Sequence, residues 1–156
     1  MKKLNRKGFT LVELLAVIII LAIVVGVSIP AITNVINDSK NNSLGVAADS
    51  AEKFASEQYS LMSVNDSLVE TNFKNKVGSL VTETSKDFEV TEPALLKAMG
   101  LDSTNITKLT MTIYKSGTVC ITINEIPTTS QYYTTAHWNS GTSPKDTAQV
   151  TSKSCP

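Results

Sequence analysis

The sequence contains few of the side chains from which catalytic and metal sites are built. His137 is its one histidine, and Cys120 and Cys155 are its two cysteines. Zinc sites take three or four such ligands, and a cysteine near a chain end is a poor platform for a nucleophile because chain ends are mobile. No glycine-rich phosphate loop is present. We therefore expect a non-enzymatic protein with no metal and no cofactor.

Positive charge is scarce outside the first seven residues. That segment holds four of the fourteen lysines and arginines, and the other ten stand against fourteen acidic residues, a net charge of −4. Phosphate groups are bound by basic surfaces, so we expect no specific nucleic-acid site. The four basic residues of the segment are Lys2, Lys3, Arg6 and Lys7.

A long run that is nearly free of charge follows this basic segment. Its apolar core covers residues 14–29, and between residues 9 and 32 only Thr10, Glu13, Ser28 and Pro30 interrupt the apolar run. A helix over residues 9–32 rises about 36 Å, which exceeds the hydrocarbon core of a bilayer, about 30 Å. The basic residues before it should stay cytoplasmic, with the C-terminal body outside. A secretory signal has a shorter core and a small-residue cleavage site, and neither is found here.

Glu13 is the one charged residue inside this region. An ionised carboxylate near the bilayer centre costs on the order of several kcal/mol. One interpretation places Glu13 close to the cytoplasmic interface, where its side chain reaches water. The other gives it a cationic partner, and the residues around it favour this second interpretation.

Those residues form a recognisable pattern. Lys-Gly-Phe-Thr-Leu-Val-Glu, preceded by basic residues, closely resembles the processing site of type IV pilins and of the pseudopilins of type II secretion. The resemblance covers residues 1 to about 40. It implies that residues 1–8 are a leader, which a prepilin peptidase removes by cutting between Gly8 and Phe9. It also implies that the new amine on Phe9 is methylated.

The same resemblance assigns a role to the apolar helix and its acid. It implies that residues 9–35 cross the membrane first and later lie in the core of a filament made of copies of the chain. There the Glu13 carboxylate is expected to pair with the Phe9 amine of a neighbouring subunit. Prepilin peptidase and a pilus assembly platform are the other implied partners. The filament would be extracellular.

Gly26 and Pro30 predict a kink in this helix. Proline removes one backbone donor and crowds the carbonyl four residues earlier, which here belongs to Gly26. A simple bend in a membrane helix and a segment that loosens during filament packing both remain open.

The rest of the sequence predicts an α+β fold in which one helix, about residues 9–60, packs on a small antiparallel sheet. Residues 36–156 would form the head, including the second half of the helix. An apolar stripe at helical spacing marks the face that meets the sheet. Its members are Ala47, Ala51, Phe54, Gln58 and Leu61.

Beyond the helix, the chain alternates between helix and strand signals. Short helices are expected within residues 66–77 and 92–100, the second with proline in its first turn and glycine just after its end. Apolar alternation over residues 109–114 and 119–124, around Lys-Ser-Gly, predicts a hairpin. Further strands are expected within residues 131–138 and near 149–152, with a surface loop over 139–145 between them.

Cys120 and Cys155 both lie in the part expected to be exported, where an even count favours one disulfide. Two inert thiols are the alternative. The pairing would resemble the disulfide-bounded C-terminal region of many type IV pilins.

Two groups of polar and aromatic residues remain. Glu83 and Glu89 are expected to be solvated. Four aromatic residues close together, if not core or subunit contacts, could form an adhesive patch. They are Tyr132, Tyr133, His137 and Trp138.

Three functions are compatible with these features. The first is a type IV pilus subunit, a major pilin, serving adhesion, motility or DNA uptake. The second is a pseudopilin or minor pilin, although Asp146 is the one acid after Glu125 and supplies a calcium loop poorly. The third is a signal-anchored extracellular domain, which would keep Met1.

Overall fold

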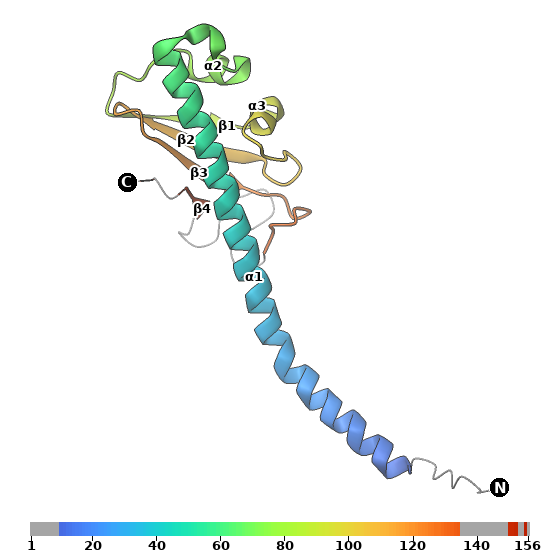
Figure 1. Ribbon diagram of the computed structural model, residues 1–156. Coiled ribbons are helices and arrows are strands. Elements are labelled where there is room, and N and C mark those ends of the chain that lie inside the picture. The colour runs from blue at the N-terminus through green and yellow to red at the C-terminus, as the bar shows by residue number, and fades with distance from the viewer. Residues whose placement is uncertain (1–9, 135–149, 153–154, 156) are drawn as a thin grey trace, which may run out of the picture. The chain divides into compact units, whose positions relative to one another are not determined.

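The computed structural model describes residues 10–134, 150–152 and 155 of the chain (Figure 1). A long N-terminal helix is followed by a small antiparallel sheet, so the α+β prediction is confirmed. The chain divides into two compact units, residues 1–38 and 39–156, and α1 contributes to both. The elements in order are α1 (Leu11–Val64), η1 (Asp66–Leu68), α2 (Thr71–Val77), β1 (Ser85–Val90), α3 (Pro93–Ala98), β2 (Lys108–Tyr114), β3 (Val119–Glu125) and β4 (Val150–Thr151).

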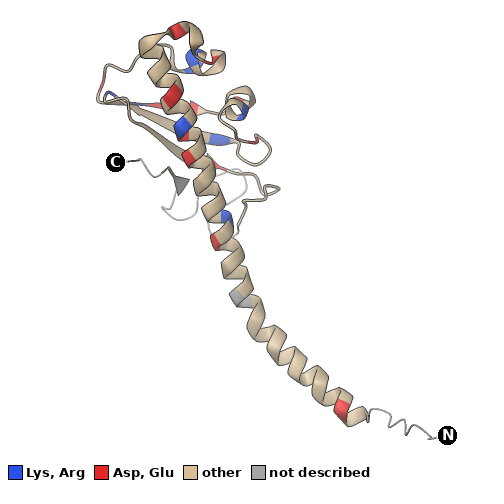
Figure 2. Ribbon diagram, in the orientation of Figure 1, with Lys and Arg blue, Asp and Glu red and all other residues tan. Residues whose placement is uncertain are grey.

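The first unit consists of the apolar part of α1. Between Glu13 and Asp38 the helix carries no charged residue, and Figure 2 shows this stretch without charge. The stretch is long and apolar enough to cross a membrane, and none of its most apolar segment is buried within the chain.

The helix continues through Gly26 and Pro30. The hydroxyl groups before and after Pro30 donate hydrogen bonds to the backbone of their own helix. Ser28 Oγ donates to the Val24 carbonyl at 2.7 Å, and Thr33 Oγ1 donates to the Ile29 carbonyl at 3.0 Å. Such bonds satisfy the hydroxyls without outside partners and favour a slight bend. The kink at Gly26 and Pro30 stays a prediction.

The second unit is built around the C-terminal half of α1, but its buried seam differs from the predicted stripe. Of the predicted residues, Ala51 and Gln58 are buried, whereas Ala47, Phe54 and Leu61 are only half-buried against the core. Phe54 instead lies beside α2, where its ring meets Phe73 edge to face at 6.2 Å. The buried apolar residues of the seam are Leu44, Ala48, Ala51, Ala55 and Tyr59.

The seam lies to one side of the predicted stripe because Ala47, Phe54 and Leu61 are further apolar residues next to it, so that spacing alone does not fix the rotation. Three of its five members are alanines. Small side chains let the helix backbone approach a layer of larger apolar side chains closely, and that layer is supplied by the sheet.

The sheet is antiparallel, with strand order β1-β2-β3-β4. The predicted hairpin is β2 and β3, and its turn has Gly117 at a φ of 90°, a conformation that glycine adopts freely. Alternate residues of both strands are completely buried in the core, while threonines face outward. The buried residues with no exposed surface are Leu109, Met111, Ile113, Ile121 and Ile123.

Strand β1 was not predicted. Phe88 and Val90 point into the core, but Lys86, Asp87 and Glu89 between and before them hide the alternation. Glu83 is exposed, as expected. Glu89 is not simply solvated, because its Oε2 lies 2.8 Å from Lys108 Nζ on β2.

The strand predicted within residues 131–138 does not form over its described part, residues 131–134. Ser130 at its start donates and accepts turn hydrogen bonds instead, so the chain curls there. Tyr132 and Tyr133 pack against the core, and His137, Trp138 and the loop 139–145 lie outside the described residues. The predicted last strand is β4.

Two polar side chains near the end of α1 hold the connection to β1. Gln58 Oε1 accepts a hydrogen bond from the Glu70 backbone at 2.7 Å, and the Tyr59 hydroxyl accepts one from the Val81 backbone at 2.9 Å. Both short helices were predicted. Glu70 caps α2 by accepting from the Phe73 backbone at 2.7 Å, and α3 begins at Pro93.

The corrected seam predicts different costs for two adjacent substitutions. Ala48→Leu adds volume where nothing is exposed and should lower the free energy of unfolding by about 1–3 kcal/mol. Ala47→Leu, at a half-buried position of the predicted stripe, should cost clearly less. Thermal unfolding of the full chain in detergent measures both. An equal or greater loss for Ala47→Leu would contradict the observed rotation of α1.

Acid should weaken the head through its carboxylates. The hydrogen bond from Lys76 lowers the pKa of Glu92, and burial raises the pKa of Glu70 less than hydrogen bonds from Phe73 and Asn72 lower it. Lowered folded-state pKa values stabilise the fold above the usual value of 4.5, and this contribution is lost as pH falls through the folded values. The melting temperature should therefore drop below about pH 4.5, and less steeply in a Glu70→Gln, Glu92→Gln variant. Parallel curves for the two proteins would contradict this assignment.

Candidate functional site

Thr10 and Glu13 form a closed set of hydrogen bonds at the start of α1. The Thr10 backbone N–H and the Thr10 hydroxyl both donate to Glu13 Oε2 at 2.8 Å. The Glu13 N–H in turn points to Thr10 Oγ1 at 3.3 Å. Thr-x-x-Glu with these reciprocal bonds is a capping box, which satisfies helix donors that have no partner within the helix.

This arrangement explains how an acid is accommodated at the head of an apolar helix. Glu13 lies in the first turn, where the helix dipole favours negative charge. Among the described residues no hydrogen bond to its second oxygen, Oε1, is found. The carboxylate is therefore fixed by its own helix and can still accept a bond from a further donor.

Thr10 is the site residue that the sequence reasoning missed. The capping-box pattern, a threonine three residues before a glutamate and an apolar run, would have identified it. Of the predicted residues, Glu13 lies in the capping box, and Gly26 and Pro30 lie further along α1. Gly8 and Phe9 fall outside the described residues, so the cut between them and the methylation of Phe9 stay predictions.

From Leu11 onward, α1 exposes apolar side chains on all its sides. Exposed fractions run from 82% for Leu11 to 45% for Val17. A monomer in water rarely leaves a continuous apolar surface of this size uncovered. Lipid or another protein must cover it. The large apolar residues exposed up to Val25 are Leu11, Val12, Leu14, Leu15, Val17, Ile18, Ile19, Ile20, Leu21, Ile23, Val24 and Val25.

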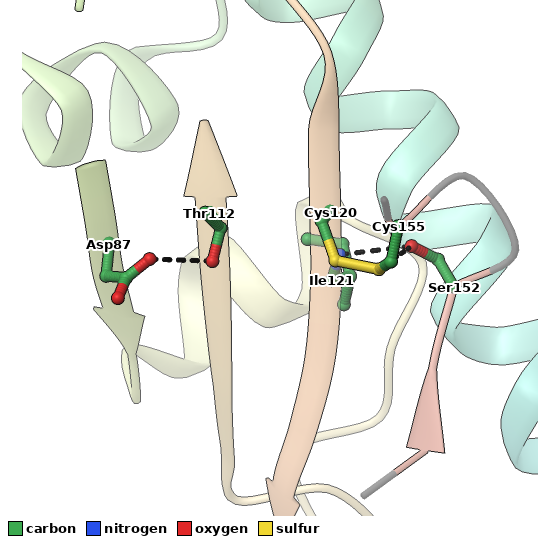
Figure 3. The surroundings of a disulfide bond; sticks show 6 residues. All are labelled: Asp87, Thr112, Cys120, Ile121, Ser152 and Cys155. Carbon is green, nitrogen blue, oxygen red and sulfur yellow. Dashed lines mark hydrogen bonds between the residues drawn. A yellow bond between two sulfur atoms is a disulfide. The ribbon is translucent and has the colours of Figure 1, made fainter. Parts of the chain in front are cut away.

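At the other end of the chain, Cys120 and Cys155 form a disulfide, with their Cα atoms 5.0 Å apart (Figure 3). The predicted pairing is confirmed, and the alternative of two inert thiols is wrong. Both sulfur atoms are used in the bridge, so neither cysteine can act as a nucleophile with His137 in this state.

The described part of the head contains no cluster of metal-ligating side chains: no three His, Cys, Asp or Glu side chains within it lie close enough to hold a metal ion. A surface hollow beside α3 is lined by Lys97, Leu101 and Asp102 among others. The backbone hydrogen bond from Thr104 lowers the pKa of Asp102, which also accepts bonds from the side chains of Thr104 and Asn105. Asp102 therefore shapes its own turn.

The capping box predicts a measurable effect of the Thr10 hydroxyl. Thr10→Val removes it and should destabilise the first turn of α1 by about 1 kcal/mol. Amide hydrogen exchange at Glu13 and Leu14, followed by NMR in micelles, should then be roughly fivefold faster. Thr10→Ser keeps the hydroxyl and is the matched control. Unchanged exchange in Thr10→Val would show that these hydrogen bonds do not hold the helix start.

Comparison with known protein families gives a match to the N-terminal segment. Residues 3–29 match the prokaryotic N-terminal methylation motif. No curated protein and no solved structure matches the chain. The matched segment contains the Gly8–Phe9 junction, the capping box and most of the exposed apolar run. The chain thus carries the class III signal peptide of type IV pilins.

Proposed function

We propose that this chain is the major structural subunit of a bacterial type IV pilus. The methylation motif supports a type IV pilin-like protein, of a pilus or a pseudopilus, and points to a structural subunit. The observation that carries the proposal is the combination of that motif with an apolar helix that the rest of the chain leaves uncovered.

The apolar helix is suited to two environments in succession. In the precursor, its uncharged stretch crosses the membrane, with the basic leader on the cytoplasmic side. In the filament, the same surface packs against copies of itself. The hydroxyls of Ser28 and Thr33 bond to their own helix, so they bring no unpaired polar group into either environment.

Processing would complete the site at the head of the helix. A cut between Gly8 and Phe9 removes all four basic side chains of the leader and creates an amine one residue before Thr10. Glu13 already holds one carboxylate oxygen on Thr10 and leaves the other open. A Phe9 amine from a neighbouring subunit can bind there, and the two charges then offset each other in a medium of low dielectric.

The head would be displayed on the filament surface. It has its own core beneath the second half of α1, and its C-terminal end is fixed by the Cys120–Cys155 bridge. Adhesion, motility and DNA uptake are the roles that such a filament serves.

A pseudopilin is the second candidate, since the methylation motif is common to both. A pilus predicts long filaments that shear from the cell surface. A pseudopilin predicts loss of protein secretion when the gene is deleted, without surface filaments.

The proposal predicts that Glu13 is needed for assembly but not for membrane insertion. Glu13→Ala should give a membrane protein with a mature, methylated Phe9 and at least about tenfold fewer sheared filaments, as expected if the lost charge pair contributes about 1.4 kcal/mol or more to assembly. Glu57→Ala removes an exposed acid of the same helix and should assemble normally. Electron microscopy counts the filaments, and mass spectrometry reads the N-terminus.

Two outcomes would contradict the proposal. Normal filament yield in Glu13→Ala would show that the carboxylate does not set subunit pairing. A wild-type chain that keeps Met1 would instead indicate a membrane-anchored extracellular domain.

A further inference from the structure

The C-terminal tail, residues 150–152 and Cys155, binds four successive residues of β3. Val150 and Thr151 pair with Ile123 and Thr122 as β4. Further along the tail, Ser152 forms hydrogen bonds with Ile121, and Cys155 forms the disulfide with Cys120. Together they line one edge of the sheet.

Ser152 extends this pairing by one further residue of β3. Its backbone N–H donates to the Ile121 carbonyl at 2.9 Å, and its hydroxyl accepts from the Ile121 N–H at 3.1 Å. The same hydroxyl lies 3.4 Å from Cys155 Sγ, which is bonded to Cys120 (Figure 3). Ser152 is buried, with 3% of its surface exposed. It therefore links the edge of β3 to the disulfide.

The two edges of the sheet are protected in different ways. On β1, the opposite edge, Lys86, Asp87 and Glu89 are charged and exposed, and such residues discourage a second chain from pairing. Strand β3 has no charged residue from Val119 to Asn124. Its edge is rich in β-branched residues and depends on the tail for cover.

The tail is held by these backbone contacts and by the covalent bond between Cys120 and Cys155. Strand β4 has two residues, and so short a strand is not stable by its backbone bonds alone. If the bridge is open, the tail can leave and the backbone groups of Ile121 to Ile123 become available. A strand that offers the same residues in the same register can then occupy the edge.

We propose that the β3 edge is a strand-exchange site between copies of this chain. When the bridge is open, the tail of a second copy occupies the edge of the first, with its Ser152 on Ile121 and its Cys155 next to Cys120. A second copy fits because its tail carries the same pairing residues and the same cysteine. A disulfide oxidant such as oxidised glutathione then closes the exchanged pair through two intermolecular Cys120–Cys155 bridges, and each bridge releases two molecules of reduced glutathione that carry the two thiol hydrogens. The inference goes beyond filament assembly and does not depend on it.

The test uses two full-length variants in detergent micelles, neither of which can close its own bridge. The acceptor carries Cys155→Ser and keeps Cys120, and the donor carries Cys120→Ser and keeps Cys155. Oxidised glutathione joins one thiol from each, and it leaves as two molecules of reduced glutathione that carry the two hydrogens. Mass spectrometry then counts the heterodimers and the two homodimers.

The ratio of heterodimer to either homodimer should be about tenfold higher than the ratio that random pairing gives, because the hydrogen bonds along the edge favour the heterodimer. Ser152→Ala in the donor should reduce this excess, whereas Ser116→Ala, at the exposed hairpin turn, should not. Random proportions, or an excess that Ser152→Ala leaves unchanged, would overturn the proposal.

A second measurement uses the wild-type chain and so does not depend on how the variants fold. Isotopically heavy and light proteins are mixed, reduced and reoxidised. Peptides joined through Cys120 and Cys155 should include heavy–light pairs, in a share that rises with protein concentration. Like-isotope pairs alone at every concentration would also overturn the proposal.

Discussion

The first half of α1 leaves its apolar side chains uncovered, and the rest of the molecule is organised around this constraint. Burial of apolar surface releases about 25 cal/mol per Å², so a helix of this composition is driven out of water. Nothing within the described chain covers it. The helix must therefore lie in lipid or against other protein. Its few polar groups fit both settings, because Thr10 binds Glu13, and Ser28 and Thr33 bind their own helix.

The second half of the same helix contributes to the core of the head. It packs against the sheet of the head. Alanines at 48, 51 and 55 allow close packing on the sheet, and Gln58 and Tyr59 bind backbone groups of the connection that follows. One continuous helix thus leaves apolar surface exposed in one part and buries it against its own sheet in the other.

At the β4 edge of the sheet, only a short stretch of described backbone is paired. Strands β1, β2 and β3 form a ladder of six or seven residues each, whereas β4 has two. The disulfide anchors the tail next to this short pairing. Charged residues on β1 and the bridged tail on β3 are two physical means of closing a sheet edge.

The sequence by itself predicted one helix over about residues 9–60, its apolar half and the β2–β3 hairpin, because strong periodicity specifies them locally. It favoured a Cys120–Cys155 bridge but left two inert thiols open, since pairing of residues 35 apart depends on the fold. It also contained the Thr10–Glu13 capping box, whose pattern is local too. Only the tertiary structure decided the rotation of α1, since both sides of its seam are apolar, and the presence of β1, whose charges hide its alternation. Only it brought Ser152 to Ile121 and the disulfide, because contacts between residues distant in sequence depend on how the whole head packs.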